Sequence, residues 1–160
     1  MDMRRLAIRG TFGTVLCPYS VITYAHEVDA GLAAVRGLAA ILAPGGRLAL
    51  DAFVPRPVEL GVTTQDYRVP FRGGSLERHK RIEEQGDGTN VIRRFYRIYD
   101  ASGDEAGSVD TVETIRPYTA ADLAAFADAS GCTVEEVAYD YGAARTAAPA
   151  QFATVVAVKR

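Results

Sequence analysis

The 160-residue sequence has no tryptophan and only two cysteines, two histidines and two methionines. Cys17 and Cys132 lie far apart along the chain, so they predict neither a disulfide framework nor a metal-binding motif. No group of cysteine, histidine and acidic residues has the spacing of metal ligands, and we therefore expect no metal site. This cysteine usage is typical of a reducing compartment, and we expect a cytoplasmic protein.

An excess of charge of one sign is also lacking. The chain has 18 lysines and arginines against 20 aspartates and glutamates, which gives a formal net charge of −2 at pH 7. This near balance provides no electrostatic basis for binding nucleic acid or an anionic membrane. No run of about 18 apolar residues predicts a transmembrane helix, and the first residues do not form a secretion signal.

Two kinds of enzyme motif are missing as well. The sequence contains neither Gly-x-Gly-x-x-Gly nor Gly-x-x-x-x-Gly-Lys, so it predicts no glycine-rich phosphate loop. It contains no Gly-x-Ser-x-Gly elbow either, which argues against an α/β-hydrolase triad.

The composition that is present, 48% hydrophobic and 24% charged, is typical of a globular domain with its own core. Residues 13–17 form a short apolar run stopped by Pro18, which predicts a buried strand. Ser20 is the expected N-cap of a short helix over residues 21–25. Apolar residues at helical spacing then predict an amphipathic helix over residues 28–42, ended by Pro44-Gly45-Gly46. A second apolar strand over residues 47–53 completes a right-handed βαβ unit with parallel strands.

Residues 54–117 are more polar and show alternation instead. Glycine-containing turns at residues 73–74, 86–88 and 102–104 separate strand-length segments, which predicts antiparallel hairpins. After this insert, Thr119 and Asp122 predict a capped helix. Strands are expected over residues 132–138 and 152–159, and the last of them should be central. The predicted fold class is therefore α/β with an antiparallel insert.

Several side chains are candidates for a site, each with a second interpretation. His26 follows the first strand on its carboxyl side, where open α/β sheets bind ligands, and is either a general base or an exposed polar residue. Cys17 is either a nucleophile or a small buried hydrophobe, and Asp51 either binds a ligand or caps a loop. The arginines of the insert either bind an anionic substrate or pair with the neighbouring acidic residues.

Two stretches of the chain resemble one family. The segment Phe12-Gly13-Thr14-Val15-Leu16-Cys17-Pro18-Tyr19-Ser20 and the pattern Leu-x-Pro-Gly-Gly-x-Leu that begins at Leu42 resemble class I S-adenosylmethionine-dependent methyltransferases of the small-molecule type. They look like the fourth strand, the next helix and the fifth strand of that fold. Residues 116–123 and 129–132 resemble the helix and turn before its sixth strand, and the closing strand resembles the seventh.

The resemblance implies a partial Rossmann-like sheet of the last four strands, parallel with an antiparallel final strand. Residues 54–117 would be an antiparallel β insert that caps the substrate. The family's glycine-rich cofactor loop and its acidic ribose-binding residue would lie before residue 1. We therefore expect residues 1–160 to be a single, N-terminally truncated domain that corresponds to the C-terminal two-thirds of the family's domain.

The implied function is methyl transfer from S-adenosylmethionine to a small-molecule acceptor, incomplete in this chain alone. The resemblance implies contacts to the cofactor from Asp2, Met3, Cys17, Pro18 and Tyr19, provided that the missing half of the pocket is supplied. His26 is the candidate base, and Tyr24 is a second candidate for the pocket.

Two other interpretations stay open, and with them the question whether the chain is an enzyme. One is a non-methylating descendant, either a small-molecule binding protein or a cyclase, in which a homodimer covers the exposed sheet edge. The other is an open reading frame whose product has no activity. Fold alone does not decide among them.

Overall fold

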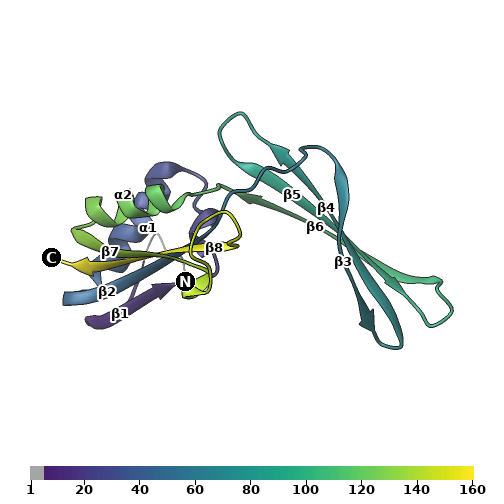
Figure 1. Cartoon of the computed structure of the whole chain (residues 1–160), viewed down its shortest axis with the longest axis horizontal. Helices are drawn as coiled ribbons and strands as arrows, with labels where there is room; N and C mark the ends of the chain where they lie inside the picture. Colours follow the sequence, from purple (N-terminus) through teal and green to yellow (C-terminus); the bar gives the residue numbers. More distant parts are fainter. Residues whose placement is uncertain (1–5) are drawn as a thin grey trace. The chain divides into compact units, whose positions relative to one another are not determined.

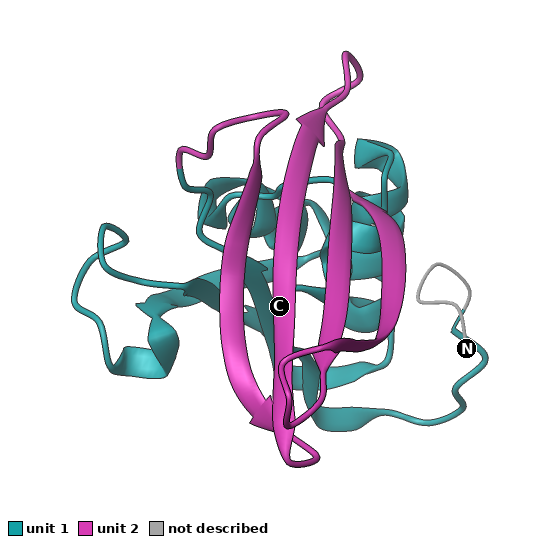
Figure 2. Ribbon diagram, turned by 90° about the vertical axis from the view of Figure 1, so that its right-hand side faces the viewer, with its two compact units in different colours: residues 1–56, 116–160 teal, residues 57–115 magenta. Residues whose placement is uncertain are grey.

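The computed structural model describes residues 6–160. The chain divides into two compact units, each with its own sheet (Figure 2). Unit 1 consists of residues 1–56 and 116–160, and unit 2 consists of Pro57–Ile115. The second unit thus lies inside the segment predicted as an insert. No helix within residues 6–160 is long and apolar enough to cross a membrane.

The sheet of unit 1 has the strand order β1-β2-β8-β7 (Figure 1). Strands β1 (Phe12–Cys17) and β2 (Leu42–Phe53) are parallel. Strand β8 (Phe152–Lys159) runs antiparallel to β2 on one side and to β7 (Cys132–Tyr139) on the other. This arrangement confirms the predicted mixed sheet with an antiparallel final strand, and the predicted central place of that strand.

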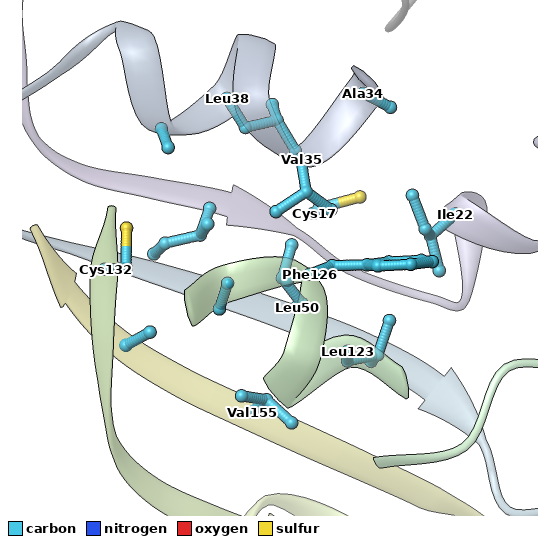
Figure 3. Packing of buried hydrophobic residues seen from close by; sticks show 14 of the residues in the cluster. Cys17, Ile22, Ala34, Val35, Leu38, Leu50, Leu123, Phe126, Cys132 and Val155 are labelled. Atoms are coloured by element: carbon cyan, nitrogen blue, oxygen red, sulfur yellow. The ribbon is translucent and has the colours of Figure 1, made fainter. Parts of the chain in front are cut away.

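Two helices cover one face of this sheet, α1 (Val28–Ala40) and α2 (Ala120–Ala129) (Figure 1). The predicted capping box of Thr119 and Asp122 is present at the start of α2. Because side chains alternate along a strand, Leu48, Leu50 and the other apolar residues of the buried face meet these helices. Figure 3 shows the resulting core, which includes Cys17, Ile22, Val35, Leu50, Leu123, Phe126, Cys132 and Val155.

The sequence predicts Pro44-Gly45-Gly46 as a turn between the helix and the second strand, but in the structure these residues lie inside β2 as an irregular bulge. Phe12 pairs with Leu42 and Thr14 pairs with Arg47, so several residues of β2 face a single position of β1. A Cβ atom on Gly46 would lie 2.9 Å from the carbonyl oxygen of Ala43 and 3.0 Å from that of Phe12. Glycine is therefore needed here because the two backbones approach so closely.

Lys159 fastens the end of α1 to the sheet. Its Nζ atom donates hydrogen bonds of 2.9 Å to the carbonyl oxygens of Ala39 and Leu42. Ala39 lies in the last turn of α1, where the helix dipole favours a positive charge, and Leu42 is the first residue of β2.

Unit 2 is a four-stranded antiparallel meander in the order β3-β4-β5-β6. The strands are β3 (Thr63–Phe71), β4 (Gly74–Glu84), β5 (Asn90–Tyr99) and β6 (Glu105–Ile115). Each follows its predecessor through a glycine-containing turn, which confirms the predicted hairpins. The alternation predicts strands over residues 66–72, 76–85, 91–99 and 108–115, and the observed strands begin one to three residues earlier.

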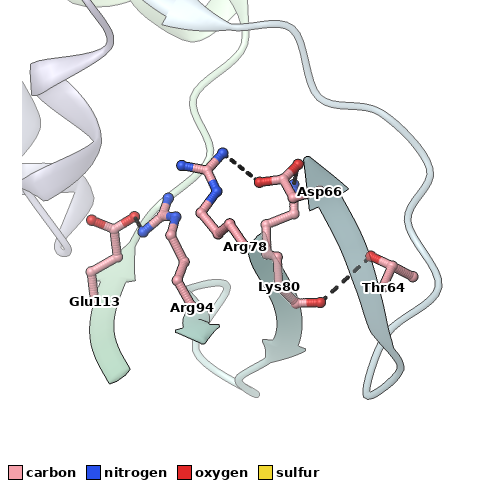
Figure 4. Close-up of polar contacts among 6 residues, drawn as sticks. All are labelled: Thr64, Asp66, Arg78, Lys80, Arg94 and Glu113. Atoms are coloured by element: carbon pink, nitrogen blue, oxygen red, sulfur yellow. Dashed lines mark hydrogen bonds and ion pairs between the residues drawn. The ribbon is translucent and has the colours of Figure 1, made fainter. Parts of the chain in front are cut away.

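Acidic residues of unit 2 neutralise much of its local positive charge. Arg78 and Lys80 both pair with Asp66, and Arg94 pairs with Glu113 on the neighbouring strand (Figure 4). The guanidinium of Arg78 also lies 4.3 Å from the centroid of the Tyr67 ring. Of the two interpretations of these arginines, the structure favours ion pairs within the sheet, each of which contributes little to stability at a surface.

Candidate functional site

The candidate site lies at the carboxyl ends of the two parallel strands β1 and β2. Parallel strands end at the same edge of a sheet, and ligands of open α/β sheets bind beyond that edge. Strand β1 leads there into Cys17, Pro18, Tyr19 and Ser20, while β2 supplies Asp51. The site is therefore built by unit 1 alone.

Asp51 joins two loops at this edge. Its side chain is only 3% exposed, and its Oδ2 atom accepts hydrogen bonds from the backbone N–H of Tyr19 at 3.2 Å and from the hydroxyl of Tyr141 at 2.8 Å. The hydrogen bond to Asp51 and burial raise the pKa of Tyr141 to about 12, so this hydroxyl stays protonated and donates at neutral pH. Of the two interpretations of Asp51, ligand binding and loop capping, these hydrogen bonds support loop capping.

Both loops contain backbone conformations that residues other than glycine rarely adopt. Tyr19 and Ser20 have φ angles of 62° and 60°, and Asp140 and Tyr141 have φ angles of 45° and 55°. Such left-handed conformations cost non-glycine residues on the order of 1–3 kcal/mol each. They persist because side chains hold them: Asp140 Oδ1 accepts hydrogen bonds of 2.9 Å from the backbone N–H groups of Gln151 and Phe152. Strain of this kind concentrates at functional sites.

Ser20 occupies the predicted N-cap position, but its side chain does not cap the helix. Its Oγ atom instead accepts a 3.0 Å hydrogen bond from the backbone N–H of Phe53 on β2. The short helix predicted over residues 21–25 is present as a 3₁₀ helix, η1 (Val21–Tyr24). Ser20 therefore ties the loop after β1 to the end of β2.

Four aromatic rings gather around these loops, and we name them the aromatic platform: Tyr19, Phe53, Tyr141 and Phe152. The Phe152 ring is nearly buried, and its centroid lies 5.5 Å from that of Tyr19, 4.6 Å from Phe53 and 5.9 Å from Tyr141. The other three are open to solvent, with exposed fractions of 73% for Tyr19, 45% for Phe53 and 62% for Tyr141. Large aromatic side chains are rarely left this exposed in a cluster unless they bind something.

Cys17 is a buried thiol, not a nucleophile. Burial and the nearby Asp51 carboxylate raise its pKa to about 11, so the thiolate is absent at neutral pH. This confirms the interpretation of Cys17 as a small hydrophobe. It forms part of the core beneath the loop that carries Pro18 and Tyr19.

The structure places Tyr24 and His26 on the segment between β1 and α1. Tyr24 is 55% exposed, and His26 is also exposed. The residues just before α2 fix this segment, because the Arg116 guanidinium donates to the carbonyl oxygen of His26 and the Tyr118 hydroxyl donates to that of Ala25 at 2.7 Å. The position of His26 is thus set through its backbone, while its imidazole is accessible to solvent.

Asp2 and Met3, the other two predicted cofactor contacts, lie outside the described residues. Tyr141, Phe152 and Thr154 are not predicted as site residues, because the sequence predicts a loop over residues 139–149 and a central strand over residues 152–159. A local signal exists for Tyr141 alone, which is an aromatic residue between Asp140 and Gly142 in a loop otherwise rich in alanine.

No protein-family model matches this sequence, and no curated protein is significantly similar to it. Solved structures do resemble it. One is SAM-bound CalS10, an amino pentose methyltransferase from Micromonospora echinaspora involved in calicheamicin biosynthesis, with a TM-score of 0.77, 24% identity and coverage of 100% of this chain and 63% of that one.

Two further structures are similar over the whole chain. The sugar N-methyltransferase KedS8 from Streptoalloteichus sp ATCC 53650 has a TM-score of 0.74 and 27% identity, and 61% of its own chain is covered. The CcbJ methyltransferase from Streptomyces caelestis has a TM-score of 0.80 and 14% identity, with 62% of its chain covered. The present chain therefore spans less than two thirds of the length of each of these neighbours.

Proposed function

We propose that this chain, whose fold is that of part of a class I S-adenosylmethionine-dependent methyltransferase, takes part in methyl transfer from S-adenosylmethionine to a small-molecule acceptor. The observation that carries the proposal is the similarity of the whole chain, with both of its units, to methyltransferases of known structure. The position of the strained loops and exposed aromatic rings, at the carboxyl edge of the sheet, supports it.

The residues after β1 suit one side of such a cofactor. Pro18 and Tyr19 form a wall of an apolar ring and an aromatic ring, and the neutral thiol of Cys17 lies in the core beneath it. When bound, S-adenosylmethionine supplies a methyl group whose carbon is attacked by the acceptor's lone pair, while the electrons of the broken C–S bond stay with sulfur. Asp2 and Met3 remain predicted contacts to its adenine.

We propose that the remainder of the pocket is supplied from outside these 160 residues. Within the described residues β1 is the edge of its sheet, and two of its apolar side chains are exposed, Phe12 at 42% and Leu16 at 64%. An apolar edge of this kind favours addition of a further strand. We propose that either additional strands of the same polypeptide or a second copy of the chain covers it.

The experiment that tests the proposal is calorimetric titration of the 160-residue chain with S-adenosylmethionine. We expect saturable binding with a dissociation constant on the order of 1 mM, because only part of the pocket's polar contacts are available. Substituting Tyr19→Ala, which removes the exposed ring of the wall, should weaken binding further, whereas Tyr67→Ala in unit 2 should not. If no saturable heat appears at millimolar cofactor, this chain does not hold the cofactor by itself.

His26 is the proposed general base, and its replacement by glutamine tests that role. Removal of an acceptor's proton by a positioned base contributes about 10²–10⁴-fold, and positioning supplies the rest. We therefore expect His26→Gln to lower kcat about 10²-fold at neutral pH with little change in KM. The measurement is the rate of methyl transfer by the chain together with the strands or the second copy that complete its pocket.

The matched control for this substitution is His79→Gln, because His79 lies on β4 in unit 2. Its kcat should equal that of the unsubstituted protein. A His26→Gln variant with an unchanged rate and pH profile would contradict the proposed base and leave positioning as the mechanism.

A further inference from the structure

We infer that Arg116 and Tyr118 are positioning residues for His26, because they fix the backbone of residues 25–27, which we name the His26 segment. The base whose position they set is that of the proposed function, so the inference rests on it. The hold on the backbone itself is a property of unit 1, which contains all of these residues.

The His26 segment lies between the 3₁₀ helix η1 and helix α1 and belongs to neither. Ala25 and Glu27 have extended backbone, with ψ angles of 91° and 139°. Glu27 is the N-cap of α1, but its side chain makes no capping hydrogen bond. Helix ends are normally fixed by such side-chain bonds, so the hold on this segment must come from another part of the chain.

Arg116 bonds to this part of the chain in two ways. Its backbone N–H donates a 2.8 Å hydrogen bond to the carbonyl oxygen of Thr23 in η1, and its guanidinium donates to the carbonyl oxygen of His26. A guanidinium is always charged in proteins, and charged donors form the stronger hydrogen bonds. Arg116 therefore holds the backbone of His26 throughout the pH range in which an imidazole titrates.

Tyr118 holds the residues on either side of His26. Its hydroxyl shares its proton between the carbonyl oxygens of Ala25, at 2.7 Å, and Glu27, at 3.3 Å. Burial raises the pKa of Tyr118, so the hydroxyl stays protonated and donates at neutral pH. The ring is only 3% exposed and meets the Phe126 ring edge-on, with 5.4 Å between the centroids, so close packing keeps the hydroxyl in place.

Gly31 of α1 leaves the space that this hydroxyl occupies. A Cβ atom at Gly31 would lie 2.7 Å from the Tyr118 hydroxyl oxygen and 3.1 Å from the Phe126 ring. Glycine is unfavourable inside a helix, and here the close approach of the hydroxyl requires it. The start of α1 is thus shaped around Tyr118.

A fixed backbone serves the proposed proton transfer. A general base must lie within hydrogen-bond reach of the proton that it removes, and a small displacement of a reacting group lowers the rate strongly. His26 is exposed whereas Ala25 before it is buried, as is Tyr118. The segment therefore presents the imidazole to solvent while Tyr118 holds its backbone from the buried side.

The first test measures the hold on the segment in the whole chain. Tyr118→Phe removes the hydroxyl and keeps the ring on Phe126, and Arg116→Gln removes the guanidinium and keeps the backbone N–H. In either variant we expect the NMR order parameters of the amides of residues 25–27 to fall from about 0.85, a rigid value, toward about 0.6. The control is Tyr139→Phe on β7, which should leave them unchanged.

The second test separates positioning from a general loss of structure. In the chain with its pocket completed, Tyr118→Phe and Arg116→Gln should each lower kcat about tenfold with little change in KM, because the base is displaced while the binding surfaces stay. In a His26→Gln background neither substitution should lower kcat further, since no base is left to position. Equal losses in both backgrounds would show a merely structural role and would overturn the inference.

The two tests also distinguish this inference from the proposed function. Unchanged order parameters in both variants, with a kcat that depends on His26, would overturn the inference and leave the proposed base intact. An unchanged kcat in His26→Gln would refute the base and with it the positioning role, even where the order parameters fall.

Discussion

Replacing Leu50 with alanine is expected to lower the free energy of unfolding by about 2–5 kcal/mol, which is a large part of the stability of a domain of this size. Leu50 has no exposed surface, and it lies on the face of β2 covered by the helices, among Val35, Leu123 and Phe126 (Figure 3). Removing its side chain leaves a cavity between sheet and helices that the surrounding residues fill only in part. The measurement is urea unfolding of the whole chain, followed by circular dichroism.

The matched control is Leu16→Ala on the neighbouring strand β1. Leu16 is 64% exposed, so its truncation removes little buried apolar surface and should change the free energy of unfolding by less than about 0.5 kcal/mol. Equal losses for Leu50→Ala and Leu16→Ala would mean that α1 and α2 do not cover β2 as described.

Replacing Gly74 with alanine should be comparably disruptive for unit 2, with an expected loss of about 1–3 kcal/mol or more. A Cβ atom at this position would meet the carbonyl oxygen of Tyr99 and lie 2.7 Å from two backbone atoms of Asp100. These are backbone atoms of the last residue of β5 and of the residue after it, which cannot rotate away, so the β4–β5 pairing that begins at Ser75 and Tyr99 must open.

Gly107→Ala on β6 is the control for this second substitution. Its Cβ atom would find only the end of the Ile98 side chain, at 4.0 Å, so the substitution should be nearly neutral or slightly stabilising. The two variants are compared by thermal unfolding and by the amide shifts of β4 and β5 in NMR spectra. Identical unfolding curves for Gly74→Ala and the unsubstituted protein would contradict the described register of this hairpin.

The sequence predicted best those parts of the fold that depend on local chemistry. Helix α1 followed from the spacing of its apolar residues, α2 from Thr119 and Asp122, and the hairpins of unit 2 from their glycine turns. Each of these signals acts within a few residues, so a single sequence contains it.

Pro44-Gly45-Gly46 and Ser20 show where local reasoning failed. The preferences of their own residues predict a turn at the first and a side-chain N-cap at the second. In the structure, Gly46 is required by the backbone of β1, and the Ser20 hydroxyl is taken by the backbone N–H of Phe53. Tertiary contacts decided both positions.

The candidate site could be predicted only in part for the same reason. Cys17, Pro18, Tyr19 and Asp51 were found because they end strands, a position that the sequence reveals. Thr154 lies opposite Asp51 because of the register of β8 against β2, and the Tyr141 hydroxyl donates to Asp51 from the loop before β8. No short-range pattern encodes a pairing between residues so distant along the chain.

The central position of β8 also sets the order in which unit 1 can assemble during synthesis. Strands β1 and β2 and helix α1 leave the ribosome before unit 2, but the strand that pairs with β2 on its far side comes last of those described. Until then the apolar edge of β2 has no partner in this sheet, and β7 cannot join it. Closure of the sheet by such distant segments is slow, and the waiting edge is open to aggregation. The nascent chain is therefore most exposed to chaperones and to misassembly after unit 2 has been made and before residues 152–159 emerge.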